Sequence, residues 1–182
     1  NPNNGYWPNC LGVINEHGKH YKKAVEQYIL SFQKDGAPIT AYRIASCYKN
    51  IGDYSSALKY IDLAIEADST DYDYVLEKAD LLYETGKTAS AVLQLTKYIN
   101  HYPDFYYGYY RRGFYKDNTN DVDGAIEDYS MSIVFEPKYA YAYLGRADMY
   151  QLKGEQMLAQ KDYEKVIELD TVPENSSCAQ YA

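Results

Sequence analysis

A repeat of 33 or 34 residues runs along the chain, and it limits the fold more than any other feature of the sequence. Its most regular member is an alanine: Ala24, Ala57, Ala91, Ala125 and Ala159. A small residue stands twelve positions before each alanine: Gly12, Ala45, Ala79, Gly113 and Ala147. A large residue stands four positions after it: Tyr28, Ile61, Leu95, Tyr129 and Tyr163. Because three registers agree in all five places, the pattern predicts an array of five equivalent structural units.

Each unit is predicted to be a helical hairpin. The two small residues let the helix backbones approach where they cross, and the large residue lies one turn further along the same helix face. The turn between the helices needs a left-handed residue, which glycine adopts most readily. The predicted turn glycines are Gly18, Gly52, Gly86 and Gly154, and residues 118–121 (Asn-Thr-Asn-Asp) serve instead in the fourth unit. Prolines at 38, 103, 137 and 173 mark the ends of four units, since proline cannot continue a helix.

The period and the order of small residue, turn, alanine and large residue resemble the tetratricopeptide repeat. The match is most specific in residues 51–58 and in Arg112-Gly113 with residues 124–129, and it extends over residues 6–173. Trp7 departs from the pattern because it lies one residue too early for the usual tryptophan. The resemblance implies an all-α fold, a right-handed superhelix whose first helices line a concave face.

The repeat also predicts the domain organisation. We expect one domain over residues 1–182, with units at 6–38, 39–71, 72–105, 106–139 and 140–173 and the start of a further helix at 174–182. Terminal units of such arrays need a polar outer face, and no complete cap follows residue 173. We therefore expect either further repeats in the native chain or a neighbour that covers this end, and self-association through it is an open alternative.

The resemblance also implies where a ligand would bind, because the family lines its groove with positions two, five, nine and twelve of each first helix. The groove residues carried over in this way, with one acidic neighbour, are Tyr42, Lys49, Asp73, Asp80, Tyr83, Glu84, Tyr107, Tyr110, Phe114, Asp117, Tyr141 and Asp148. The chain has 24 tyrosines, which are densest in residues 105–110. These rings either lie flat on their neighbours or form a binding surface. We favour binding, because tyrosine buries a large area, loses few rotamers and keeps a hydroxyl for hydrogen bonding.

Charge narrows the class of partner. The formal net charge is −8, and an acidic chain repels the phosphates of nucleic acids and of anionic membranes. No apolar run is long enough for a membrane span, so we expect no membrane insertion. Carboxylates beside aromatic rings suit Lys or Arg side chains, through ion pairs and cation–π contacts. The preferred ligand is therefore a basic peptide or protein segment.

The sequence does not favour an enzyme. His17 and His20 flank a turn, His101 stands apart, and the three cysteines are scattered, so no metal site is expected. Asp73 and Asp80 are seven residues apart on one predicted helix, where an acidic solvated surface explains them better than acid–base catalysis. There is no phosphate-binding glycine loop, and we expect no cofactor.

Three functions follow from these patterns. The leading hypothesis is a scaffold or adaptor that holds a protein segment in the groove. The alternatives are a carbohydrate-binding surface, because tyrosines and carboxylates also suit sugars, and a docking arm of a larger multidomain protein or enzyme. The compartment is not determined by any of these features.

Overall fold

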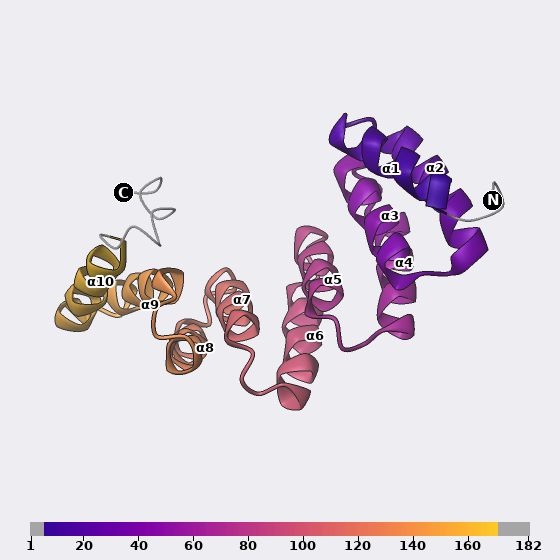
Figure 1. Cartoon of the computed structure of the whole chain (residues 1–182). Helices are drawn as coiled ribbons and strands as arrows, with labels where there is room; N and C mark the ends of the chain where they lie inside the picture. Colours follow the sequence, from indigo (N-terminus) through magenta and orange to yellow (C-terminus); the bar gives the residue numbers. More distant parts are fainter. Residues whose placement is uncertain (1–5, 171–182) are drawn as a thin grey trace. The chain divides into compact units, whose positions relative to one another are not determined.

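The computed structural model describes residues 6–170, which contain ten α-helices and no strand (Figure 1). The chain divides into two compact units at the turn between Lys87 and Thr88. Unit 1 contains α1 (Tyr6–His17), α2 (Tyr21–Asp35), α3 (Pro38–Ile51), α4 (Tyr54–Ala67) and α5 (Tyr72–Glu84). Unit 2 contains α6 (Thr88–His101), α7 (Tyr106–Asp117), α8 (Val122–Phe135), α9 (Ala140–Leu152) and α10 (Gln156–Asp170). The predicted helix at 174–182 lies outside the described residues, and the single-domain organisation stays a prediction.

Within each unit, every helix packs against the next one along the chain. Alternate helices also meet, α3 with α5 in unit 1 and α7 with α9 in unit 2. First helices of successive hairpins are therefore neighbours, and their side chains share one face in each unit. No helix within residues 6–170 has both the length and the apolar character that crossing a bilayer requires.

The small residues of the repeat lie in the cores of both units. The repeat alanines 24, 57, 91 and 125 are fully buried, as are Ala45, Ala79 and Ala147. A methyl group added at Gly12 would stand 2.4 Å from a ring carbon of Tyr28, so no larger residue fits where α1 crosses α2. Close approach of the helix backbones thus explains the pattern, as the sequence predicted.

The turns follow the repeat register, and one prediction about them is wrong. Gly52, Gly86 and Gly154 have left-handed φ angles of 84°, 76° and 77°. In the first hairpin the left-handed residue is Lys19 (φ 56°) and not Gly18. Each left-handed residue lies seven positions after the small residue of its first helix, where the last turn closes, and Gly18 is one position short.

The fourth hairpin has no glycine at this place and uses Asn120, with φ 62°. Asparagine tolerates this conformation better than most residues with a side chain. The helix that follows begins with a capping aspartate, because the Asp121 side chain accepts a hydrogen bond from the Gly124 backbone N–H at 3.1 Å. Asp53 caps α4 in the same way, from the Ser56 N–H at 3.0 Å.

Buried ion pairs fix successive helices of unit 2. Arg112 on α7 binds both carboxylate oxygens of Asp128 on α8, at 2.9 and 2.5 Å, and donates to the Thr96 hydroxyl on α6 at 3.0 Å. Lys116 adds a contact to Asp128 at 2.9 Å. One guanidinium therefore connects three consecutive helices.

The same arrangement recurs 34 residues later. Arg146 on α9 binds Asp162 on α10 through two hydrogen bonds of 2.7 and 2.8 Å, and it donates to the Ser130 hydroxyl on α8 at 3.1 Å. The Asp162 side chain is only 6% exposed. A planar guanidinium matches a carboxylate in this bidentate geometry, which fixes the relative position of the helices.

Candidate functional site

The twelve predicted groove residues are divided between the two units. Unit 1 holds Tyr42, Lys49, Asp73, Asp80, Tyr83 and Glu84. Unit 2 holds Tyr107, Tyr110, Phe114, Asp117, Tyr141 and Asp148. Each set lies on the first helices of its unit. The two sets differ in whether their charged side chains already form ion pairs within the chain.

In unit 1 the single predicted cation is already surrounded by carboxylates. The Lys49 ammonium on α3 lies 3.4 Å from Glu77 and 3.5 Å from Glu84, both on α5. Burial lowers the pKa of Lys49, but Glu77, Glu84 and Asp80 raise it more, so its pKa is raised overall. Glu77 was not among the predicted residues, although it provides the closest partner of Lys49.

Glu77 is itself held in an unfavourable place for a charge. Its Oε1 atom is buried and has no hydrogen-bond partner in the described part of the chain. Burial raises the pKa of Glu77, and this effect outweighs the lowering by Lys49. The pair is thus a structural contact between α3 and α5, and little of its charge is available for a ligand.

The tyrosine of this face is also partly a packing residue. The rings of Tyr42 on α3 and Tyr74 on α5 are 5.3 Å apart. Burial raises the pKa of Tyr42 to about 12, with help from the carboxylates of Glu77 and Asp73. Tyr83 is half-buried, whereas Asp73 is exposed at the start of α5.

Unit 2 carries a group of five tyrosines in mutual contact, which we call the tyrosine cluster: Tyr106, Tyr107, Tyr110, Tyr139 and Tyr141. Its centre is Tyr139, whose ring meets Tyr110 edge-on at 5.1 Å and Tyr106 at 5.2 Å. Tyr107 stacks on Tyr110 at 5.8 Å, and Tyr141 lies 6.4 Å from Tyr110. Burial raises the pKa of Tyr139 and of Tyr110 above the usual range of a tyrosine hydroxyl.

Two carboxylates of α7 and α9 stand close to each other in this unit. Burial raises the pKa of Asp117, and the nearby charge of Asp148 raises it further. Asp148 accepts a hydrogen bond from the Tyr163 hydroxyl on α10 at 2.7 Å. Among residues 6–170, neither carboxylate forms an ion pair with a lysine or arginine. Unlike Glu77 and Glu84 of unit 1, these two carboxylates have no direct ion-pair partner among the described residues.

Phe114 is the predicted residue of unit 2 that is most engaged in packing. The Arg111 guanidinium carbon lies 5.6 Å from its ring and 5.4 Å from the Tyr115 ring. The Phe114 ring also meets Tyr115 at 6.0 Å. Phe114 therefore belongs to a local cation–π group with Arg111 and Tyr115.

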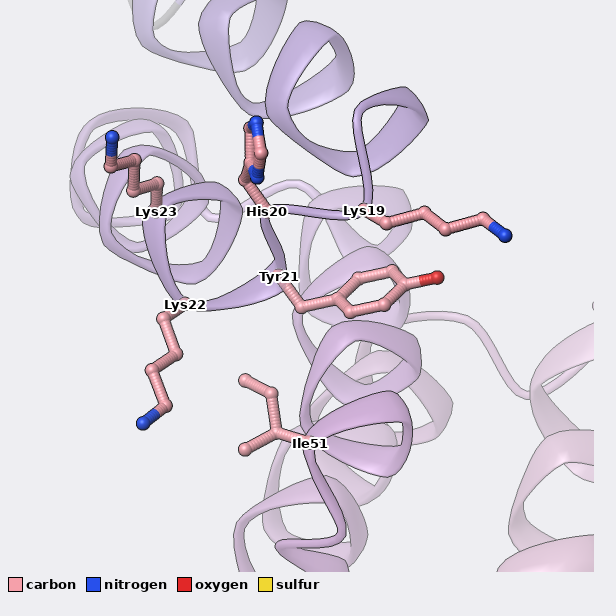
Figure 2. Close-up of a pocket in the computed structure, with 6 residues that line it drawn as sticks. All are labelled: Lys19, His20, Tyr21, Lys22, Lys23 and Ile51. Atoms are coloured by element: carbon pink, nitrogen blue, oxygen red, sulfur yellow. The ribbon is translucent and has the colours of Figure 1, made fainter.

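A pocket of about 470 Å³ lies at the turn between α1 and α2, lined by three lysines, His20, Tyr21 and Ile51. Figure 2 shows that the side chains of Lys19, Lys22 and Lys23 extend in different directions from this turn. Their ammonium groups do not converge on a common point, so the pocket is no built anion site. In the described range, no group of three or more His, Cys, Asp or Glu side chains could hold a metal ion.

These features define a class of protein, the helical-hairpin arrays whose side chains on successive first helices form a shared face. Two family models match the chain. Residues 38–104 match the YpiA-like, C-terminal tetratricopeptide repeats, and residues 140–172 match the tetratricopeptide repeat. The chain belongs to the tetratricopeptide repeat family.

A curated relative supports this assignment. A TPR repeat-containing protein of Methanocaldococcus jannaschii is 27% identical over 123 residues, which are 64% of this chain and 20% of that protein. The chain thus spans about a fifth of the length of the relative that it matches.

Solved structures share the fold over almost the whole chain. A crystal structure of MamA has a TM-score of 0.77 at 20% identity and covers 97% of this chain and 94% of that one. MamA from Desulfovibrio magneticus RS-1, from residue 41 to its end, has a TM-score of 0.78 at 16% identity, with coverage of 93% and 96%. YrrB, a TPR protein with an unusual peptide-binding site, has a TM-score of 0.69 at 15% identity, with coverage of 100% of this chain and 94% of that one. The predicted all-α helical-repeat solenoid is confirmed.

Proposed function

We propose that the chain is a protein-interaction scaffold, not an enzyme, and that it binds a basic segment of a partner protein on the first-helix face of unit 2. The observation that carries this proposal is the pair of carboxylates, Asp117 and Asp148, which lack a cationic partner beside the tyrosine cluster. A lysine or arginine of the partner would neutralise them, while apolar parts of the segment contact the tyrosine rings. The corresponding face of unit 1 is less suited to a basic ligand because Lys49 already pairs with Glu77 and Glu84.

The known relatives are consistent with this role. YrrB has the same fold and is described as having a peptide-binding site. The family places its ligands on the first-helix face, which is where the unpaired charge of this chain lies. A docking role within a longer protein agrees with the greater length of the archaeal relative.

A sugar ligand is less well supported by the same residues. Sugars stack on the open face of an aromatic ring, whereas Tyr110 and Tyr139 meet edge-on at 82° and cover each other. Self-association through the C-terminal end stays a separate proposal. The helix expected there lies outside the described residues, although α10 does leave Met157 and Ile167 exposed at 87% and 64%.

An array of immobilised twelve-residue peptides tests the proposal directly. The peptides would be matched in apolar content and would carry net charges from negative to positive, with the fluorescently labelled chain as the probe. We expect binding to rise with positive charge, and to fall when Asp117→Asn and Asp148→Asn are combined.

The matched control changes two exposed acids of the same unit, Asp104→Asn with Glu127→Gln, and so alters the net charge equally. We expect this control to keep the preference for basic peptides. Equal binding of acidic and basic peptides, or equal loss in both double variants, would contradict the proposal.

A further inference from the structure

One junction of unit 1 contains a guanidinium held by the chain itself. The Tyr28 side chain on α2 is fully buried, and its hydroxyl donates to the Glu16 carboxylate on α1 at 2.5 Å. Arg43, from the next first helix α3, donates to the same hydroxyl at 3.2 Å and lies 3.8 Å from the Glu16 carboxylate. A carboxylate and a tyrosine hydroxyl together hold this arginine.

The repeat register locates the equivalent places in unit 2. Asp117 corresponds to Glu16, because each stands four residues after the small glycine of its first helix. Tyr129 corresponds to Tyr28, because each stands four residues after the repeat alanine. Position 145 corresponds to Arg43, because each stands two residues before the small alanine, and it is glycine. The junction of α7, α8 and α9 therefore has the carboxylate and the tyrosine but lacks the arginine.

Tyr129 is left without the partners that its counterparts have. Its side chain is 2% exposed, and no hydrogen bond to its hydroxyl is found in residues 6–170. The third tyrosine in this register, Tyr163, donates to Asp148 at 2.7 Å and approaches the Gln151 side-chain oxygen at 2.9 Å. The Tyr129 oxygen is not among the fully buried unpartnered side-chain atoms of the described residues, so it keeps contact with solvent and is open to a hydrogen bond from another molecule.

The contacts of the Tyr129 ring show where its hydroxyl points. A methyl group added at Gly145 would stand 2.6 Å from Cζ, the ring carbon that carries the hydroxyl, and one added at Gly113 would stand 3.0 Å from Cε1. The ring thus lies between α7 and α9, the helices that carry Asp117 and Asp148. Both carboxylates, after burial, raise the pKa of Tyr129, which agrees with a hydroxyl directed toward them.

The chain cannot fill this place by itself. Any side chain at position 145 would collide with the Tyr129 ring, so an arginine there could not repeat the geometry of Arg43. The Asp148 side of the junction is exposed to solvent, and the Tyr110 ring lies 5.9 Å from the Tyr129 ring. A cation from another molecule can therefore approach the carboxylates from the exposed side, next to an aromatic ring.

We propose that Asp117, Asp148 and Tyr129 form a receptor for one arginine side chain of the partner protein, which takes the role that Arg43 has in unit 1. This inference rests on the proposed function and names the side chain that the basic segment must carry. Arginine suits the site better than lysine, because its planar guanidinium can donate to two carboxylates and the hydroxyl at once.

Peptides that differ at one residue separate this inference from the broader proposal. A basic peptide selected on the array would be made with arginine, lysine or citrulline at its central position, and fluorescence anisotropy would measure each affinity. We expect the arginine peptide to bind about ten-fold more tightly than the lysine peptide, and the uncharged citrulline peptide to bind weakest. N-acetyl-arginine amide, which is the side chain without a peptide, is expected to bind far more weakly than the peptide.

Two variants make the same chemical change at an unfilled and at a filled junction. Tyr129→Phe removes the hydroxyl that has no partner within the chain. We expect it to lower the affinity for the arginine peptide about five- to ten-fold and to reduce the difference in affinity between the arginine and lysine peptides. Tyr28→Phe is the control, because its hydroxyl is already engaged by Arg43. It should leave both affinities unchanged.

The outcomes distinguish the two proposals. If lysine and arginine peptides bind equally and both are lost in the Asp117→Asn, Asp148→Asn double variant, the scaffold proposal stands and the arginine receptor is overturned. If Tyr129→Phe changes nothing, the receptor is likewise overturned. Equal affinity for N-acetyl-arginine amide and for the peptide would overturn the assignment to a protein segment. If no basic peptide binds, both proposals fail.

Discussion

Replacement of Arg146 by methionine should destabilise unit 2 strongly. Methionine keeps much of the length of the side chain but removes both hydrogen bonds to the buried carboxylate of Asp162. Breaking a buried ion pair by removing one partner costs about 3–5 kcal/mol, because a charge is left buried and uncompensated. The lower figure applies here, since the arginine itself is partly exposed. For a chain of this length, a loss of about 3 kcal/mol lowers Tm by about 6–12 °C.

A double-mutant cycle shows whether the ion pair is the cause. Urea unfolding, followed by circular dichroism, would be measured for Arg146→Met, for Asp162→Leu and for the two together. The double variant removes both charges, so we expect it to be more stable than Arg146→Met alone, with a coupling free energy of about 2 kcal/mol. Lys165→Met is the control, because its ion pair with Glu168 is exposed, and its loss should cost less than about 0.5 kcal/mol.

Hydrogen exchange adds the location of the effect. Each hairpin of a repeat array contacts only its neighbours. In Arg146→Met we therefore expect the protection of amide hydrogens from exchange to fall in α8, α9 and α10 before it falls in unit 1. The view that this ion pair fixes the helices would be refuted by either of two results. In the first, the losses of unfolding free energy in the two single variants add up to the loss in the double variant. In the second, Arg146→Met loses no more stability than Lys165→Met.

Three further predictions concern stability. Tyr28→Phe should lower the free energy of unfolding by about 1 kcal/mol, measured by urea unfolding, because it removes a hydroxyl bonded to Glu16 and Arg43. Tyr129→Phe should leave the free energy of unfolding almost unchanged, and equal losses in the two variants would contradict this. Glu77→Gln should raise the urea midpoint of unfolding at pH 7 but not at pH 4. The pKa of Glu77 is raised in the folded state, so the ionised carboxylate destabilises the fold as pH rises through that pKa. A lower midpoint for the variant at pH 7 would contradict this. Lys19→Gly should raise the free energy of unfolding by about 1 kcal/mol in urea, because glycine adopts the left-handed φ of this turn without a steric penalty. An unchanged free energy of unfolding would mean that the turn is not strained.

The sequence predicted the helical hairpins because their cause is local and periodic. A small residue, a left-handed turn and a large residue each leave a mark at a fixed position, so the buried alanines and the turns at Gly52, Gly86 and Gly154 could be predicted. The error at Gly18 arose from reading glycine as the signal. The distance of seven residues from the small position predicts Lys19 without reference to glycine content.

The candidate site was predictable in position but not in charge. The repeat register predicted that Asp117 and Asp148 lie on first helices, and whether they bind a ligand stays a prediction. The pairing of Lys49 with Glu77 depends on how far two side chains reach between helices, which no periodicity encodes. Tyr139 precedes its helix, outside the register positions, so its place at the centre of the tyrosine cluster needed the three-dimensional structure.

The pairing of Arg112 and Arg146 with hydroxyls of the preceding hairpin bears on how the array can change in length. Thr96 and Ser130 occupy the same register, and each accepts from the arginine sixteen residues further on. Excision of the 34 residues from 106 to 139 would bring Thr96 to the place of Ser130, in front of Arg146, with the hydroxyl preserved. Loss of this one repeat therefore leaves the junction chemically intact, whereas loss of two repeats would bring Asp62 to the same place and remove the hydroxyl. The shared register of Thr96 and Ser130 thus makes this single repeat removable without loss of the hydroxyl that Arg146 binds.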